Sequence, residues 1–265
     1  MFYPIMSVLD LVGWTDLVYL PPNHWEKSPH SKLRIYVIWS DGINWNSLFI
    51  CDIKRGDHKL LESSELPREC LITGIAFAYV TSKELPANMK TLPTENLWKS
   101  DIPEWRASSG FKNQYCQTSY QADVAPLPPK ASMLSFHPFI QYGSVSNYLL
   151  LLNLKSDPSI VSSKLTIYST RSKRVFLEAE IRANSATVIP LDPLDIPRNE
   201  LPVIESKNLA AIPFGVGISH DERQISMEHT HPPASLTIYG DRRVTQGKIK
   251  RSWSEYLSRG VVDEN

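Results

Sequence analysis

The sequence has no excess of either charge, because Lys and Arg together number 28 and Asp and Glu together number 28 in its 265 residues. A basic surface for nucleic acid or for an anionic membrane is therefore not favoured. Gly is scarce, at 11 residues, and the Gly-rich patterns that hold phosphate groups are missing. These deficits argue against nucleotide-binding and nucleic-acid-binding classes of protein.

Cysteine is also sparse. Cys51, Cys70 and Cys116 are an odd number and lack Cys-x-x-Cys spacing, which argues against a disulfide scaffold. No apolar run approaches the length of a membrane span, and the segment that begins Met1-Phe2-Tyr3 lacks the basic start of a signal peptide. We therefore expect a soluble cytoplasmic protein with no membrane partner.

Proline is plentiful, at 20 residues, and separates many short segments with strand-like alternation. Strands are expected at 33–39, 48–53, 71–81, 114–121, 148–154, 164–168, 174–181, 186–190, 212–219, 224–230 and 235–239. Helical patterns are rare before residue 241. The sequence therefore predicts an all-β fold of two tandem β-sandwich modules with a C-terminal α-helix.

Two segments of the chain look like copies. Pro129–Phe136 resembles Pro232–Tyr239, and each follows a polar strand that itself follows an Ile-Pro step, at Ile102-Pro103 and Ile212-Pro213. Repetition of this kind predicts an internal duplication. The domains expected are a covering segment at 1–31, a first module at 32–140, a second at 141–240, and an amphipathic helix and tail at 241–265.

The second half is similar to small sandwich proteins of the sensory-rhodopsin-transducer type in its order of strands and its closing polar strand. No motif in the sequence is specific to that family. The resemblance implies a sandwich fold for this half and does not identify a site.

Residues 212–230 read as a hairpin whose four-residue turn is His220-Asp221-Glu222-Arg223. Ser219 then pairs with Gln224, and Ile218, Val216 and Phe214 lie opposite Ile225, Met227 and His229. Because strand side chains alternate between faces, His229 and His231 continue the apolar, buried face.

Two imidazoles on one strand face lie about 7 Å apart and could both reach a divalent metal ion. A third ligand would have to come from the distant regions of Cys116, Asp123 or His137. Hydrogen-bonded structural histidines are favoured over a metal site, and a metal-free ligand pocket is the other alternative. No cofactor is favoured.

Several planar or hydrogen-bonding side chains suit a sugar or another small polar ligand. They are Arg106, Tyr115, Gln117, Tyr120, Gln121, His229 and His231. The sequence therefore favours a non-enzymatic protein that binds a carbohydrate or small polar ligand, or an accessory subunit of an assembly, including a homo-oligomer. The alternative is a hydrolase or isomerase that uses His229 and His231, with or without a metal. No catalytic residue is identified.

Overall fold

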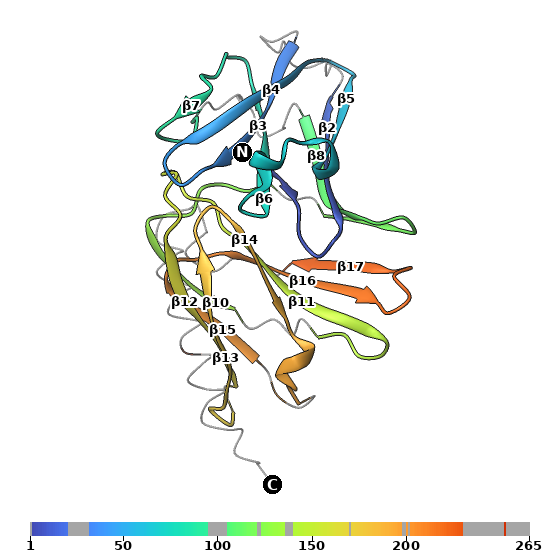
Figure 1. Ribbon diagram of the computed structural model, residues 1–265, viewed down its shortest axis with the longest axis vertical. Helices are drawn as coiled ribbons and strands as arrows, with labels where there is room; N and C mark the ends of the chain where they lie inside the picture. Colours follow the sequence, from blue (N-terminus) through green and yellow to red (C-terminus); the bar gives the residue numbers. More distant parts are fainter. Residues whose placement is uncertain are drawn as a thin grey trace. The chain divides into compact units, whose positions relative to one another are not determined.

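The computed structural model describes residues 2–20, 32–94, 105–120, 123–135, 140–169, 171–197, 200, 202–229 and 252 (Figure 1). The chain divides into two compact units. The first comprises Met1–Ala125, Ser156–Ile160 and Asn184–Ala186, and the second comprises Pro126–Lys155, Val161–Ala183 and Thr187–Asn265.

The described strands of the first unit form two antiparallel sheets. One has the order β1 (Phe2–Met6), β6 (Ile75–Thr81), β3 (Lys32–Ser40), β4 (Trp45–Lys54) and β7 (Asn88–Met89). The other has the order β5 (His58–Glu62), β2 (Val12–Tyr19), β8 (Trp105–Lys112) and β9 (Gln117–Tyr120). Both sheets contribute to one core, in which Ile5, Ile35 and Val37 of the first sheet cluster with Leu17 and Leu61 of the second.

The second unit repeats this order of strands. One sheet runs β10 (Lys130–Ser135), β15 (Pro202–Asn208), β12 (Ser162–Ser169) and β13 (Val175–Arg182). The other runs β14 (Ala186–Pro190), β11 (Val145–Leu152), β16 (Ile212–Ser219) and β17 (Ile225–His229). Taken in chain order, β10 to β17 occupy the places that β1 to β6, β8 and β9 occupy in the first unit. The internal repeat predicted from the sequence is thus present in the strand order.

A continuous apolar run in the sequence marks a buried strand of the second unit. The five leucines of Leu149–Leu154 predict a fully buried strand, and β11 buries each of Leu149 to Leu152 between β14 and β16. Apart from the single residue Ser252, helical structure in the described residues consists of three short 3₁₀ turns. They are η1 (Ser63–Glu65), η2 (Arg68–Leu71) and η3 (Asp192–Leu194). No described helix is long and apolar enough to cross a membrane.

The all-β class is confirmed, but the predicted fold of two sandwich modules with a C-terminal helix is wrong. The described strands instead form four small antiparallel sheets, two in each unit, and no described helix reaches seven residues. Alternation identifies strands but not their distant partners: β1 pairs with β6, and β10 pairs with β15. The modules expected to start at residues 32 and 141 omitted these first strands. The helix and tail predicted at 241–265 lie, except for Ser252, outside the described residues.

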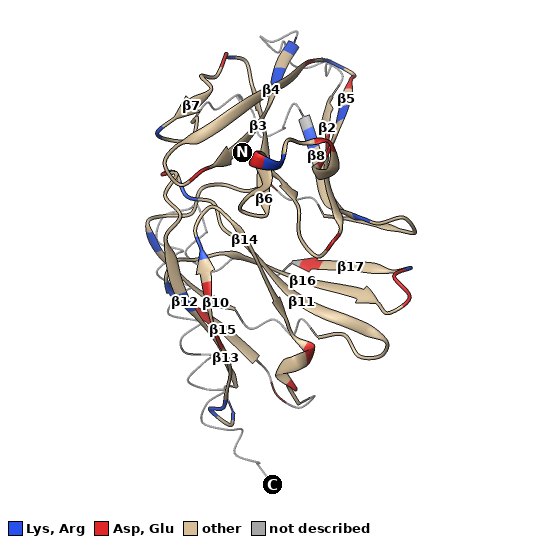
Figure 2. Ribbon diagram, in the orientation of Figure 1, with Lys and Arg blue, Asp and Glu red and all other residues tan. Residues whose placement is uncertain are grey.

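Charged residues of both signs are interspersed rather than gathered by sign (Figure 2). The β16–β17 turn shows this pattern, with Asp221, Glu222 and Arg223 in succession. An interspersed surface of this kind agrees with the balanced charge of the sequence.

Candidate functional site

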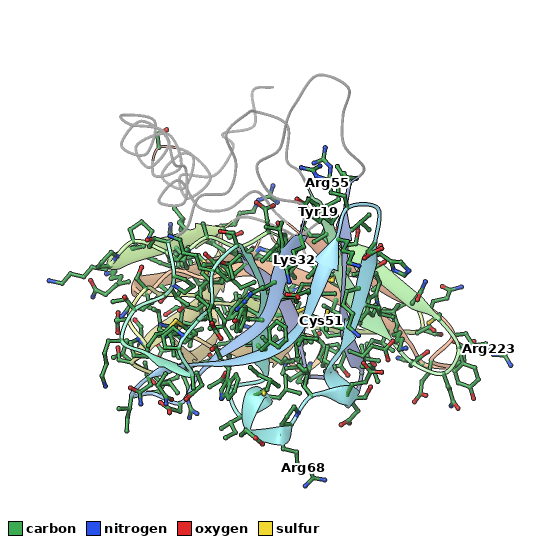
Figure 3. All side chains as sticks on the ribbon, turned by 90° about the horizontal axis from the view of Figure 1, so that it is seen from above. Tyr19, Lys32, Cys51, Arg55, Arg68 and Arg223 are labelled. Carbon is green, nitrogen blue, oxygen red and sulfur yellow. The ribbon has the colours of Figure 1, made fainter. Side chains whose placement is uncertain are left out.

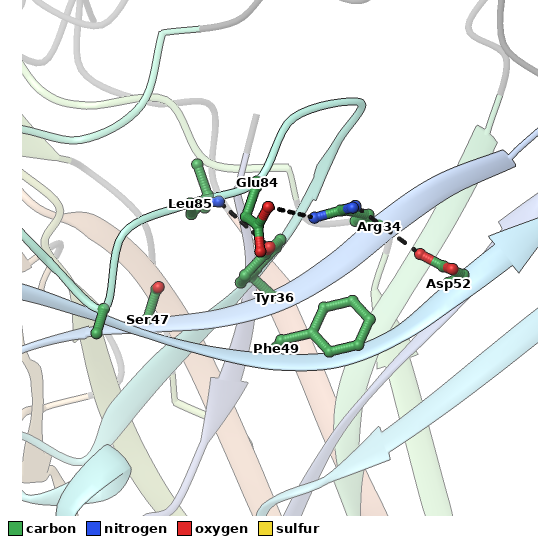
Figure 4. Close-up of a pocket in the computed structure, with 8 residues that line it drawn as sticks. Arg34, Tyr36, Ser47, Phe49, Asp52, Glu84 and Leu85 are labelled. Carbon is green, nitrogen blue, oxygen red and sulfur yellow. Dashed lines mark hydrogen bonds and ion pairs between the residues drawn. The ribbon is translucent and has the colours of Figure 1, made fainter.

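The first unit holds an open pocket of about 370 Å³ on the face of β3 and β4 that points away from the shared core (Figure 4). The loop between β6 and β7 forms its other wall. The pocket is lined by Arg34, Tyr36, Ser47, Phe49, Asp52, Glu84, Leu85 and Ala87. Its volume is within the range of small-molecule sites.

A β-bulge places the pocket residues on one face. Arg34 pairs with Asp52 and Ile35 with Cys51, but Tyr36 then pairs with Phe49, so β4 contains one extra residue, Ile50. Without the bulge Ile50 would lie opposite Tyr36, and Phe49 would turn toward the core. The bulge therefore brings an aromatic ring beside a charged pair.

Arg34 lies between two carboxylates, as Figure 4 shows. Its Nη1 is 3.6 Å from Oε2 of Glu84, and its Nε is 4.0 Å from Oδ1 of Asp52. A hydrogen bond with the Tyr36 side chain raises the pKa of Arg34, and the charges of Glu84 and Asp52 add to that effect. The guanidinium is therefore held in its charged form.

Asp52 has a closer partner than Arg34. Nζ of Lys32 donates a hydrogen bond of 2.8 Å to Oδ2 of Asp52. This hydrogen bond lowers the pKa of the Asp52 carboxyl, so the group is ionised at neutral pH. Asp52 therefore forms ion pairs with both Lys32 and Arg34.

The aromatic wall of the pocket has one buried ring and one open ring. Tyr36 is only 3% exposed, whereas Phe49 is 49% exposed. Their ring centroids lie 5.5 Å apart in an edge arrangement with an interplanar angle of 63°. Phe49 therefore presents an apolar surface beside the charged groups.

Hydrogen bonds from β3 and β4 fix the loop that closes the pocket. The Tyr36 hydroxyl accepts a hydrogen bond of 3.2 Å from the Leu85 backbone N–H. The Ser47 hydroxyl donates one of 2.9 Å to the Pro86 carbonyl, and the Ser47 N–H donates another of 2.9 Å to the Ala87 carbonyl. The loop residues that follow Glu84 are therefore held by both strands.

The described members of the ligand-residue set predicted from the sequence do not all lie on one face of their sheet. Arg106 of β8 pairs with Val18 of β2. Gln117 of β9 lies opposite Lys112, which is six residues after Arg106 on β8. Tyr120 lies opposite Ser109 and so faces the other side of the sheet from Arg106 and Gln117. Burial raises the pKa of Tyr120, and the charge of Asp123 adds to the shift.

Tyr115 lies in the turn between β8 and β9 and is 57% exposed. Its backbone N–H donates a hydrogen bond of 2.8 Å to Oδ1 of Asn113, which shapes the turn. Gln121 lies outside the described residues. The described lining of the pocket does not include Arg106, Tyr115, Gln117 or Tyr120.

The hairpin register predicted for residues 212–230 is confirmed. Phe214 lies opposite His229, Val216 opposite Met227 and Ile218 opposite Ile225, and the Ser219 N–H donates to the Gln224 carbonyl at 3.0 Å. The opposite face of β16 carries glycines. There Gly215 and Gly217 are buried too, and a Cβ on Gly217 would lie only 2.8 Å from Nε2 of Gln141.

The histidine pair itself cannot be placed. The backbone of His229 ends β17, its side chain is not described, and His231 lies outside the described residues. Among the described residues, no group of three His, Cys, Asp or Glu side chains is placed to hold a metal ion. The divalent-metal site and the hydrolase or isomerase activity at these histidines stay predictions.

None of the pocket residues was predicted from the sequence, although some signals were present. Arg34 and Asp52 are charged residues within otherwise apolar strands, and the long loop that begins at residue 82 is typical of a functional loop. The bulge that turns Phe49 outward has no Gly or Pro to mark it.

Comparisons with protein-family models, curated proteins and solved structures found no match.

Proposed function

We propose that this chain is a non-enzymatic binding protein that holds a small polar ligand, a saccharide in particular, in the pocket between β3, β4 and the β6–β7 loop. The observation that carries the proposal is the half-exposed ring of Phe49 beside an arginine flanked by two carboxylates. A sugar has an apolar ring face and a hydroxyl rim. The pocket offers a matching surface for each.

The two kinds of surface act on different parts of the ligand. The C–H face of a sugar ring packs on an aromatic side chain, as Phe49 permits, and excludes water from it. Asp52 accepts hydrogen bonds from ligand hydroxyls, and Arg34 donates them. Such directional groups give orientation, while the aromatic contact supplies most of the buried apolar area.

The test is isothermal titration calorimetry of the full chain with glucose, galactose and their disaccharides. The Phe49→Ala variant should bind about tenfold more weakly, because losing an aromatic contact costs about 1.4 kcal/mol. Ile72→Ala is a matched control, since Ile72 is 77% exposed and does not line the pocket.

Two outcomes would contradict the proposal. One is that no saccharide in the panel binds the wild-type chain at millimolar concentration. The other is that a bound saccharide keeps its full affinity for Phe49→Ala, which would place binding elsewhere on the molecule.

A further inference from the structure

The two carboxylates beside Arg34 differ in how firmly they are held. Asp52 lies on β4, opposite Arg34, and accepts a 2.8 Å hydrogen bond from Lys32. Glu84 belongs to the β6–β7 loop and its side chain is 83% exposed. Within the described part of the chain, its one ion pair is the 3.6 Å contact with Arg34. Exposed ion pairs of this length stabilise a protein little, so Glu84 can leave Arg34 at small cost.

Because Arg34 holds Glu84 only weakly, it can bind the carboxylate of a ligand in place of Glu84. The planar guanidinium suits bidentate pairing with such a group, and charge-assisted hydrogen bonds of this kind are stronger than neutral ones. Lys32 and Arg34 balance Asp52 and Glu84 in charge. When Glu84 moves into solvent, an incoming anion restores that balance beside Arg34.

The ring of Phe49 sets the second requirement. Arg34 and Tyr36 are two residues apart on one face of β3, about 7 Å along the strand, and Phe49 pairs with Tyr36. A group bound to Arg34 therefore lies beside the open side of Phe49. A ligand that fills both positions joins a carboxylate to a ring.

We infer that the pocket selects a ligand with a carboxylate next to a six-membered ring, and that this carboxylate takes the place of Glu84 on Arg34. The inference rests on the proposed function and narrows its ligand class to sugar acids. Glu84 then acts as a built-in competitor, which weakens binding of acidic ligands and leaves neutral ones nearly unaffected.

The test is calorimetry of the full chain with three probes: glucuronate, glucose and cyclohexanecarboxylate. Glucuronate should bind about tenfold more tightly than glucose, because only glucuronate carries the charged partner for Arg34. Raising the salt concentration should weaken the binding of glucuronate and leave that of glucose nearly unchanged.

Variants of Glu84 and Arg34 test the inference more directly than the comparison of ligands. Glu84→Gln should bind glucuronate about threefold to fivefold more tightly and glucose as before, because a weak competing ion pair is removed. Glu65→Gln is the matched control, because Glu65 is exposed in η1 and does not line the pocket. Arg34→Gln should lose the preference for glucuronate, and Arg34→Lys should keep only part of it. Circular dichroism checks that each variant is folded.

The outcomes separate the inference from the proposed function. If glucose binds as well as glucuronate, or if Glu84→Gln leaves the glucuronate affinity unchanged, the inference is wrong and saccharide binding stands. Binding of cyclohexanecarboxylate alone supports carboxylate selection and contradicts the saccharide proposal. If none of the three probes binds, both are wrong.

Discussion

Thr15 and Ser109 form a buried pair of hydroxyl groups between β2 and β8. Both residues are fully buried, and their oxygens lie 2.8 Å apart. The Thr15 hydroxyl is also 2.7 Å from the Pro4 carbonyl of β1, to which it donates. These contacts tie the first strands of both sheets of the first unit together.

Replacing Thr15 with Val should destabilise the protein by about 1–3 kcal/mol, because a similar shape remains but two buried polar groups lose a partner. Urea unfolding measures the change in free energy. Thr91→Val, at an exposed position, serves as the control and should change stability by less than about 0.5 kcal/mol. Equal midpoints for the two variants would show that the hydroxyl pair contributes nothing.

Cys70 is a second buried residue with a measurable consequence. It is 1% exposed, and burial, with a smaller contribution from the Glu69 charge, raises the pKa of its thiol to about 11. The folded state therefore holds the thiol proton more tightly than the unfolded state does. The stability that this proton confers is complete below about pH 8.5, the ordinary thiol pKa, and is lost as the pH rises through 11.

The stability of the wild-type chain should fall by about 2 kcal/mol more than that of Cys70→Ala between pH 8 and pH 11, at about 1.4 kcal/mol per pKa unit. Urea midpoints at several pH values give the comparison. The Ala variant should start lower at neutral pH, because a small cavity replaces the sulfur. Parallel pH curves for the two chains would refute the role of the thiol.

Gly13 allows β1 and β2 to approach each other closely. A Cβ at this position of β2 would lie 1.8 Å from the Met6 carbonyl oxygen of β1, and the Gly13 N–H donates a 3.0 Å hydrogen bond to Ser63. Any side chain would therefore separate the two strands.

Gly13→Ala should lose several kcal/mol of stability or fail to fold, because backbone atoms rather than a mobile side chain stand in the way. Gly56→Ala is the comparison, since its φ of +88° carries a cost of about 1 kcal/mol but no atom lies within 4 Å of the added carbon. Thermal unfolding monitored by circular dichroism compares the stability of the two variants. The reverse ranking would contradict the close approach at Gly13.

Among the elements, the β16–β17 hairpin could be predicted from the sequence, and the pocket could not. The hairpin depends on local alternation and on a turn of known length, so its register follows from neighbouring residues. The pocket depends on the unmarked bulge at Ile50 and on a loop that returns from beyond β6. Pairing between strands that are distant in sequence produces no local sequence pattern. The predicted arrangement of the sheets was therefore also wrong.

At the scale of the whole chain, the first unit includes short segments far along the sequence. The Trp45 indole donates a 2.9 Å hydrogen bond to the Ser156 carbonyl, and the Ser40 hydroxyl donates to the Pro158 carbonyl. Residues 1–125 are therefore not the complete first unit. The similarity of Pro129–Phe136 to Pro232–Tyr239 does not mark the repeated strand order, because β10 is the counterpart of β1 and residues 232–239 lie outside the described residues. The inclusion of distant segments in the first unit has no local sequence pattern either.

A fragment of residues 1–125 should be less stable than the same residues in the full chain, because these hydrogen bonds lose their acceptors. Native-state hydrogen exchange at the amides of β3 and β4 compares the two, and the fragment should exchange faster. Equal protection in both would mean that segments 156–160 and 184–186 do not stabilise the first unit.

The sugar-acid inference places a ring that carries a carboxylate in the pocket on β3 and β4. The most direct test is a two-dimensional nitrogen–proton NMR titration of the full chain with glucuronate. We expect shifted backbone amides at residues 34–36, 47–52 and 84–87, with the Arg34 side-chain signal among them. Shifts centred on the β8–β9 hairpin or on β17, or no shifts at all, would contradict the account.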